Sequence, residues 1–378
     1  MRASQAAMLA NVVRDVFYWA CFSIFMTSVI SQVGVSLASE PGIGQIETLP
    51  GTEPLDWSGD IASRMIDAID AFLLRQTEHT AKLRQQAWAS VFSPDQWPSD
   101  WLQAKRERLA QILGVKDPRV SPVQMTILSP PGQSRPLAEG AGYDVYAVSW
   151  DVFTDLKAEG ILLYPKHDQP KACVVAIPDA DVSPEALIGL ELGVPPASQY
   201  ARRLAESGCV VVIPSLISRE ISKRGNVSLT HREFIYRPAY ELGRHIIGYE
   251  LAKILAAIDY FDSAFPTLGG NFGVIGWGEG GMLALYAGAL DARLGVVGVS
   301  GYFGPREHLW QAPVDRNVFG LLKDFSDAEI SLLIYPRSCV IEAARGPEVT
   351  IPPKLGGAPG ELKTPSLEEV KNEFDRAN

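Results

Sequence analysis

Four short and almost wholly apolar runs constrain the fold of this chain more than any other feature. They lie at residues 172–177 (ACVVAI), 209–213 (CVVVI), 272–275 (FGVI) and 294–299 (LGVVGV). Continuous apolar runs are typical of strands that are buried on both faces, as in a parallel sheet. Helical patterns at 199–206, 246–265 and 282–290 separate these runs. We therefore predict an α/β fold, a mostly parallel sheet with helices on both faces.

The flanking segments complete the predicted layout. Strand-like runs at 123–128, 143–153 and 160–164 come before the apolar runs, and a run at 332–341 comes after them. Two helical patterns come first, and both are expected to serve packing. In the first, one face carries Ile61, Met65, Ile69, Phe72 and Leu73, and the second extends from an expected N-cap at Ser99 to Leu113. We expect a linker and helical extension at 39–117, the α/β domain at 118–345, and a Pro/Gly-rich tail with a short helix at 346–378.

An uncharged apolar segment near the N-terminus predicts export. Residues 17–37 contain no charged side chain, Arg2 and Arg14 precede them, and residues 36–38 (SLA) are small where a signal peptidase cleaves. The strongly apolar part, 17–30, has the length of a signal-peptide core and is short for a membrane span. We expect 1–38 to be a signal peptide cleaved near Ala38, and the protein to be periplasmic or extracellular. An uncleaved signal anchor is the alternative, and it is the one membrane contact that we expect.

The charge balance excludes some classes of partner. Asp and Glu number 44 against 34 Lys and Arg, which gives a net charge of -10. Proteins that bind nucleic acid usually present a basic face, so no nucleic-acid partner is expected. The 4 cysteines lack the paired spacing of a zinc site, and the 5 histidines include no helical H-x-x-x-H pair. Neither a metal nor a cofactor is expected.

The most informative motif is the strand–turn–helix segment 272–285, FGVIGWGEGGMLAL. An apolar strand enters a turn rich in glycine, and an apolar helix leaves it. The nucleophile elbow, G-x-S-x-G, has the same layout and needs small residues two positions before and two positions after its nucleophile. Gly276 and Gly280 stand at these two places, and the nucleophile position is Gly278.

On these residues the chain resembles the α/β-hydrolase superfamily, especially its dienelactone-hydrolase and acetyl-xylan-esterase-like members. The resemblance covers roughly 145–349 and includes GILLYP, ACVVAIP, the elbow and LGVVGVSGYF. It implies a three-layer fold, hydrolysis of carboxylic esters, and a carbohydrate ester or another small molecule as the ligand. It also implies an eighth strand, and we expect the sheet to lack this last strand because no clear apolar strand follows residue 345.

The residues that ester hydrolysis needs are not at the expected positions. Gly278 has no side chain that could attack an ester. Glu279 could replace it only if Trp277 fitted a position that requires a small residue. The resemblance places the acid near Glu342 and the histidine beyond the last histidine of the chain, His308. Our leading hypothesis is an exported hydrolase-fold protein whose serine-esterase activity is degenerate or absent.

Two alternatives stay open. One is an active ester hydrolase with a non-standard site. The other is a dinucleotide-binding protein, because Gly276, Gly278 and Gly281 satisfy G-x-G-x-x-G. That pattern normally follows the first strand of its fold, and an acidic residue ends the next strand. Here several strands come first, and Val299 is followed by Ser300.

Three further groups are candidate site residues. His308 lies in a loop after a strand end and is either a general base or a surface residue. Asp179 and Ala180 follow the run 172–177, where their backbone N–H groups could hold an oxyanion or form an ordinary turn. The last group either lines a pocket for an anionic or sugar-like ligand or forms a loop of ion pairs. Its members are His231, Arg232, Tyr236 and Arg237.

Overall fold

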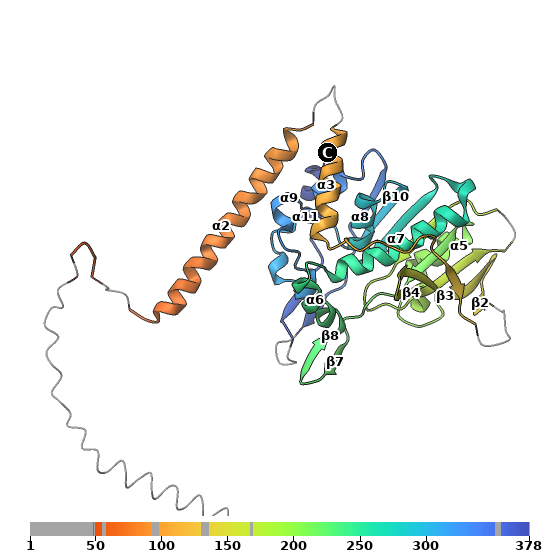
Figure 1. The fold of residues 1–378 in the computed structure, drawn as a ribbon, viewed down its shortest axis with the longest axis horizontal. Helices are drawn as coiled ribbons and strands as arrows, with labels where there is room; N and C mark the ends of the chain where they lie inside the picture. The colour runs from red at the N-terminus through yellow and green to blue at the C-terminus, as the bar shows by residue number, and fades with distance from the viewer. Residues whose placement is uncertain are drawn as a thin grey trace, which may run out of the picture. The chain divides into compact units, whose positions relative to one another are not determined.

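A computed structural model describes most of the chain after residue 57. The described residues are 48, 50–54, 58–92, 98–129, 136–166, 169–351 and 357–377. The chain divides into two compact units, Met1–Asp67 and Ala68–Asn378, and the second unit contains the sheet (Figure 1). The predicted signal peptide, 1–38, and its cleavage site lie outside the described residues. Within the described part, no helix is both long enough and apolar enough to cross a membrane.

A mixed, mostly parallel sheet forms the centre of the larger unit. Its main strands, in spatial order, are β1 (Met125–Ile127), β3 (Tyr143–Phe153), β4 (Leu156–Pro165), β6 (Val210–Pro214), β5 (Cys173–Ile177), β9 (Phe272–Trp277), β10 (Leu294–Ser300) and β11 (Ser338–Glu342), with β2 (Ala138–Glu139) paired to β3. The pairs from β1 to β6 are antiparallel, and those from β6 to β11 are parallel. Among the described residues, no strand pairs with the far side of β11.

Helices cover the sheet on both faces. Successive residues of β5 point to opposite faces, so Val175 belongs to the main core and Ala176 to a smaller cluster. The main core includes buried side chains of α3 (Ser99–Ile112), α7 (Ile246–Ala264) and α8 (Glu279–Leu290). The smaller cluster lies under α4 (Pro184–Leu187) and α5 (Tyr200–Glu206). The predicted α/β fold class is confirmed: the sheet is mostly parallel and helices cover both of its faces.

Some predicted boundaries are wrong for local reasons. The predicted strand 332–341 begins only at Ser338, because Leu332 ends the helix α10 (Asp327–Leu332), whose apolar side chains face the core. Ser99 is the first residue of α3, and Pro98 holds the N-cap position. The other elements of this unit are β7 (Ile221–Arg224), β8 (Val227–Thr230), α6 (His231–Glu241), α9 (Leu321–Asp324), β12 (Val349–Ile351), β13 (Gly360–Leu362) and α11 (Leu367–Asp375).

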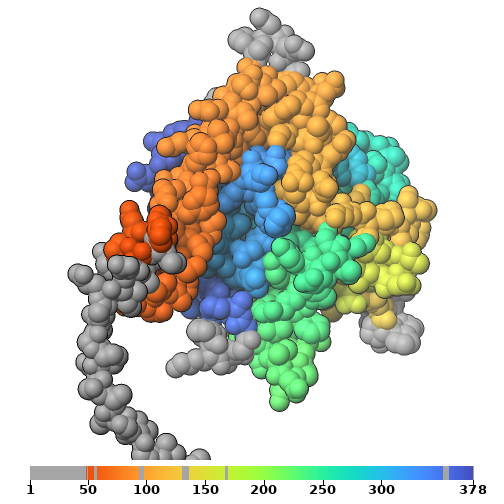
Figure 2. Space-filling view, turned by 60° about the vertical axis from the view of Figure 1, so that its left-hand side comes forward, coloured from red at the N-terminus to blue at the C-terminus, as the bar shows by residue number. Residues whose placement is uncertain are grey.

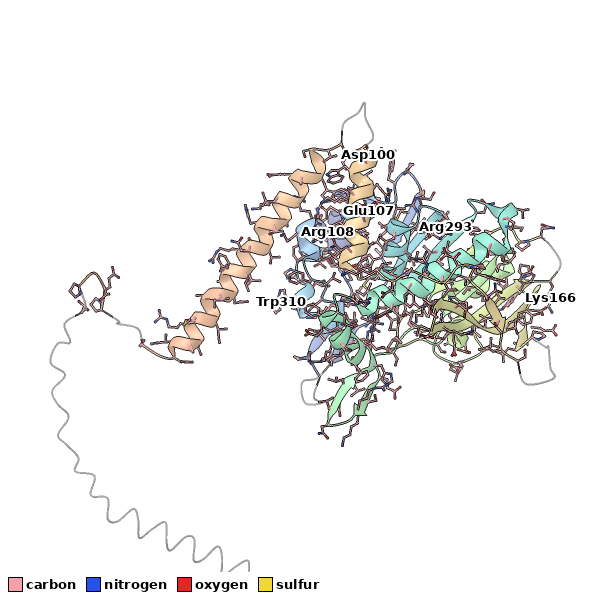
Figure 3. All side chains as sticks on the ribbon, viewed as in Figure 1. Asp100, Glu107, Arg108, Lys166, Arg293 and Trp310 are labelled. Carbon is pink, nitrogen blue, oxygen red and sulfur yellow. The ribbon has the colours of Figure 1, made fainter. Side chains whose placement is uncertain are left out.

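The buried side chains of the first long helix, α2 (Ile61–Ala89), are Arg84 and Trp88, near its C-terminal end. There Arg84 is buried and forms ion pairs with Glu329 and Glu307, and the Trp88 indole donates to the carbonyl oxygen of Asp324. Asp324 also accepts from Arg108 of α3, one of the residues labelled in Figure 3. The apolar face that the sequence predicts as a packing surface is exposed, and α2 lies at the surface in Figure 2. The hydrophobic periodicity predicts an amphipathic helix, but it does not show which element covers the apolar face of that helix.

The turn between β9 and α8 is packed backbone against backbone. A Cβ atom added to Gly276 would lie 2.0 Å from the carbonyl oxygen of Gly280. One added to Gly280 would lie 2.1 Å from the carbonyl oxygen of Ile177 on the neighbouring strand. Heavy atoms at these distances overlap, and backbone atoms cannot move away as the end of a flexible side chain can. Both positions therefore require glycine so that strand and helix can approach each other.

We expect Gly280→Ala to destabilise the fold by on the order of 3 kcal/mol, the upper end for overpacking, because the clash is with backbone. The measurement is urea unfolding followed by tryptophan fluorescence. Gly269→Ala is the control, since an added Cβ there meets nothing closer than 3.6 Å and its φ is negative. Equal unfolding midpoints for the two variants would contradict this account of the turn.

Candidate functional site

The turn residue Gly278 has the backbone conformation of an elbow but no free space above it. Its φ of 62° and ψ of -119° lie where residues with side chains are rarely found. A Cβ atom at this position would lie 2.7 Å from Asp179 Oδ1 and 2.7 Å from Pro347 Cδ. The carboxylate and the proline ring therefore fill the volume that a nucleophilic side chain would need.

The Asp179 carboxylate binds the backbone N–H that follows the elbow residue. Glu279 N donates to Asp179 Oδ1 at 2.9 Å. In α/β-hydrolases this N–H is one of the two groups that hold the substrate oxyanion. Arg219 clamps the same carboxylate through Nη1 to Oδ2 at 2.7 Å and through Nη2 to Oδ1 at 3.2 Å. Burial raises the pKa of Asp179, but Arg219 outweighs it and holds that pKa below its ordinary value, so the group is ionised at neutral pH.

Glu279 itself is fully buried and is held by three arginines. Arg232 Nη2 lies 2.6 Å from its Oε1, and its Oε2 accepts from Arg316 Nη2 at 2.6 Å and from Arg219 Nη2 at 3.1 Å. Burial raises the pKa of Glu279, but the combined charge of these arginines, Arg232 first, holds that pKa far below its ordinary value. The carboxylate is therefore ionised, and it is enclosed rather than open to a substrate.

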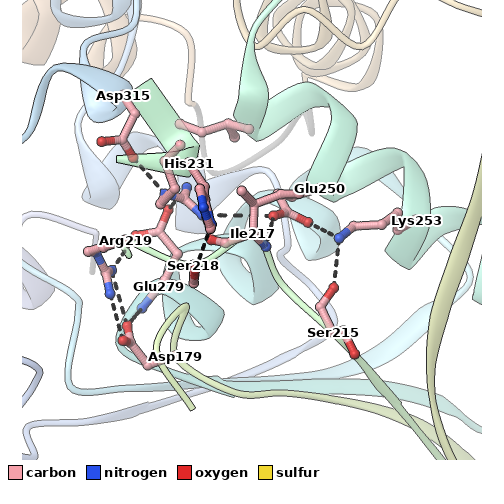
Figure 4. A network of polar contacts seen from close by, with 12 residues as sticks. Asp179, Ser215, Ile217, Ser218, Arg219, His231, Glu250, Lys253, Glu279 and Asp315 are labelled. Carbon is pink, nitrogen blue, oxygen red and sulfur yellow. Dashed lines mark hydrogen bonds and ion pairs between the residues drawn. The ribbon is translucent and has the colours of Figure 1, made fainter. Parts of the chain in front are cut away.

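The ion pairs extend from the elbow into a larger buried network (Figure 4). Arg232 Nε contacts Asp315 Oδ2 at 2.6 Å, and Arg232 Nη1 lies 3.8 Å from Glu250 Oε1. Glu250 also pairs with Lys253 and accepts from the backbone N–H of Ile217 at 2.8 Å. Buried charges are tolerated when they are paired and hydrogen-bonded in this way. The network therefore joins α6, α7 and the loops after β6 and β10 to the elbow.

The four residues predicted to line a pocket do not converge. Only Arg232 reaches the elbow, through Glu279. His231 Nδ1 lies 3.1 Å from the Ser218 hydroxyl, and Tyr236 packs edge-on against His245. Arg237 is mostly exposed and pairs with Glu233 one helical turn earlier. The stretch is a helix, α6, whose successive side chains point in different directions.

The other predicted site residues lie apart from the elbow. Glu342, at the end of β11, accepts from the Ser300 hydroxyl at 2.6 Å. His308 is exposed and lines a cavity of about 260 Å³ beside residues 361–365. Ala180 is buried next to Asp179. The sequence analysis did not identify four residues near the elbow: Arg219, Arg316, Asp315 and Ser300. The arginines could have been expected from Glu279, because a carboxylate in a packed glycine turn requires cations nearby.

A cavity of about 810 Å³ opens beside the elbow, at the carboxyl ends of β5 and β9–β11. Its polar lining includes Asp179, Ser300 and Glu342, and most of its other walls are apolar. Neither Gly278 nor Glu279 lines it. Within the described ranges, no group of three or more His, Cys, Asp or Glu side chains could hold a metal ion.

We expect Glu279→Gln to cost about 3–5 kcal/mol at pH 7, because it removes one member of a buried network and leaves the arginines undercompensated. The folded pKa of Glu279 lies below its ordinary value of 4.5, so its contribution is present above that pH and is lost as the pH falls below it. Denaturant unfolding from pH 7 to pH 3 measures both effects.

The stability of the wild-type protein should fall more steeply below about pH 5 than that of Glu279→Gln. Glu361→Gln is the control, because Glu361 is half exposed and pairs with an exposed lysine, Lys363. Its cost should stay below about 1 kcal/mol. Similar costs for the two substitutions would contradict a structural role for the Glu279 network.

Comparison with solved structures supports the fold. A candidate acetyl xylan esterase from Bacteroides fragilis is similar with a TM-score of 0.53 and 15% identity, over 76% of this chain and 75% of that chain. A methylesterase gives a TM-score of 0.49 at 15% identity over 70% and 55% of the two chains, and a glucuronoyl esterase from Solibacter usitatus gives 0.48 at 14% over 76% and 80%. No family model and no curated protein matches the sequence. The chain therefore shares the α/β fold of the Bacteroides fragilis protein, and at this identity the likeness extends to the fold alone.

Proposed function

We propose that this chain is an exported hydrolase-fold protein that has lost ester hydrolysis and retains the fold for binding. One observation supports this most: the ionised Asp179 carboxylate accepts the N–H of Glu279 directly beside Gly278. An ester hydrolase stabilises negative charge at that N–H during the reaction. A fixed carboxylate there repels such charge and leaves the donor unavailable.

Three requirements of serine-esterase chemistry are missing at the same place. Gly278 supplies no nucleophile, Asp179 occupies an oxyanion donor, and Pro347 closes the space in front of them. One lost oxyanion donor alone costs about 3–4 kcal/mol of transition-state stabilisation in a working hydrolase. No histidine contacts the elbow in the described part of the chain, since His308 lies in a separate cavity and His231 bonds Ser218.

The ligand is proposed only by class. The resemblance to carbohydrate esterases suggests a carbohydrate ester or another small molecule. Such a ligand has no room above Gly278, so it would have to use the polar groups at the ends of β10 and β11, Ser300 and Glu342. Export is proposed from the apolar segment at 17–37.

The active-hydrolase alternative has one specific observation in its favour. The hydroxyl of Ser300 donates to the Glu342 carboxylate at 2.6 Å, and both line the cavity beside the elbow. A carboxylate can act as a general base for a hydroxyl nucleophile. The neighbouring backbone N–H of Gly301 donates to the Glu342 carbonyl oxygen, so it is not free to hold an oxyanion. This pair is therefore the second candidate, behind a non-catalytic role.

The dinucleotide alternative is disfavoured by charge. In that use of a glycine turn, a pyrophosphate sits at the N-terminus of the following helix. Here the carboxylates of Asp179 and Glu279 both lie at the start of α8, and both are ionised. Close packing within the fold accounts for the pattern's first and last glycines, because an added Cβ atom would lie 2.0 Å from the Gly280 carbonyl oxygen at Gly276 and 2.7 Å from the Ser300 carbonyl oxygen at Gly281.

The proposal is tested with an aryl acetate and acetylated xylo-oligosaccharides as substrates. The wild-type protein and Gly278→Ser should both show no turnover above buffer, because a serine at 278 would meet Asp179 and Pro347. Thermal unfolding of each variant serves as the folding control. Turnover by the wild type that Ser300→Ala abolishes would contradict the proposal and favour the Ser300–Glu342 pair, and turnover that appears in Gly278→Ser would contradict the blocked-elbow argument.

A further inference from the structure

One face of the sheet carries a strip of nine positions in register. The register of β9, β10 and β11 aligns them in three rows, which are Gly273, Val296 and Ser338, then Ile275, Gly298 and Val340, then Trp277, Ser300 and Glu342. Side chains two residues apart on a strand share a face, so these nine form one surface. Its first two rows are apolar apart from Ser338, and its third row is the polar end described above. We call this surface the strip.

Among the described residues, nothing covers the β10–β11 side of the strip, whereas Gly273 and Gly298 are buried. The smaller core cluster under α4 and α5 reaches the sheet as far as Ile275, and it includes no residue of β10 or β11. Val296 is 51% exposed and Val340 is 59% exposed, which is unusual for valines in the inner rows of a parallel sheet. The cavity of about 810 Å³ lies over the second and third rows of the strip and is bounded by residues of the α4–α5 region on one side.

The dimensions of the strip suit one helix. Neighbouring strands are about 4.8 Å apart, so the distance from β9 to β11 is about 10 Å. An α-helix with its side chains has a diameter of about 10–12 Å. Parallel sheets in α/β folds are normally covered by helices on both faces. An amphipathic helix with an apolar face is therefore the occupant that the strip fits.

The helix α2 presents an apolar face that no other described element covers. On α2, Ile69 is 56% exposed and Phe72 is 50% exposed, and Leu73 and Leu83 are exposed as well. At 100° per residue these four side chains fall within one arc of the helix. Arg84 and Trp88 hold the next turns of α2 against residues of α9 and α10, away from the strip. Each copy of the chain therefore exposes an apolar helix face and an apolar sheet face at the same time.

We propose that two copies of this chain pair, with α2 of each copy covering the first two rows of the strip of the other, beside the polar third row to which the proposed function assigns its ligand. In a two-fold symmetric dimer, each copy covers both apolar surfaces of the other, and the assembly is closed. Exposed apolar side chains that lie next to one another mark interaction sites in many soluble proteins. The partner is argued as a second copy because the strip needs a helix and this chain supplies one. The inference does not depend on whether the elbow is catalytic.

The test measures the mass of the purified full chain in solution by light scattering after gel filtration. The wild type should be a dimer, and Phe72→Lys on the helix and Val340→Lys on the strip should each be monomers with unchanged circular dichroism. Val227→Lys is the matched control, an exposed valine on β8 outside both surfaces, and it should remain a dimer.

Mixing the two monomeric variants provides the decisive result. A mixed dimer of Phe72→Lys and Val340→Lys retains one intact pairing of helix and strip, so mixing should restore dimers, with weaker affinity than the wild type. If α2 instead paired with α2, Val340→Lys would remain a dimer by itself, and the proposal would be wrong. A monomeric wild type would also overturn it. In that case, two further measurements identify what covers each surface. If the protein sediments with phosphatidylglycerol vesicles and Phe72→Lys prevents this, α2 binds a membrane. If xylo-oligosaccharides bind tightly and Val340→Lys abolishes the binding, the strip binds a small molecule.

Discussion

The burial of one carboxylate, Glu279, organises much of this structure. A charged group without water must be surrounded by opposite charge, and here that charge comes from Arg219, Arg232 and Arg316. These three residues come from the loop after β6, from α6 and from the loop after β10. Segments that are distant in sequence are therefore tied to the first turn of α8. The removal of the carboxylate would loosen all of them together.

The same network explains how the elbow backbone is stabilised with glycine at position 278. A catalytic elbow must keep a reactive side chain exposed and a backbone N–H unpaired until substrate arrives, which stores strain and an unsatisfied donor. In this chain glycine relieves the strain at position 278, and Asp179 satisfies the donor. Arg219 then compensates the charge that Asp179 introduces. Glycine at 278, Asp179 and Arg219 each stabilise the fold at this turn, and none of them disturbs the close packing of Gly276 and Gly280.

The sequence predicts the sheet and the elbow well because both depend on local patterns. Apolar runs such as 172–177 and 294–299 are typical of buried strands, and the glycine spacing at 276–280 reflects close contacts at the turn. The ion network is not predictable in this way, since Arg219 and Arg316 reach Glu279 across many residues of intervening chain. The pocket predicted around Arg232 and Arg237 shows what local patterns miss. Both residues are on α6, but Arg232 pairs with the buried Glu279 carboxylate and Arg237 is mostly exposed to solvent.

Within the described residues, the β10–β11 side of the sheet and the apolar face of α2 have one property in common: no other element covers them. A parallel sheet is stable when helices bury both of its faces, and the second face here is covered only as far as β9. The hydrophobic effect acts equally on exposed apolar area of a sheet and of a helix, at about 25 cal/mol per Å². Val296 and Val340 on the sheet and Ile69 and Phe72 on α2 therefore all favour association that removes them from water. Arg84 holds the C-terminal end of α2 through a buried ion pair with Glu329. Bending α2 onto the sheet of the same copy would break this ion pair, which is costly for buried charges. Pairing between two copies covers both apolar surfaces and leaves the ion pair intact.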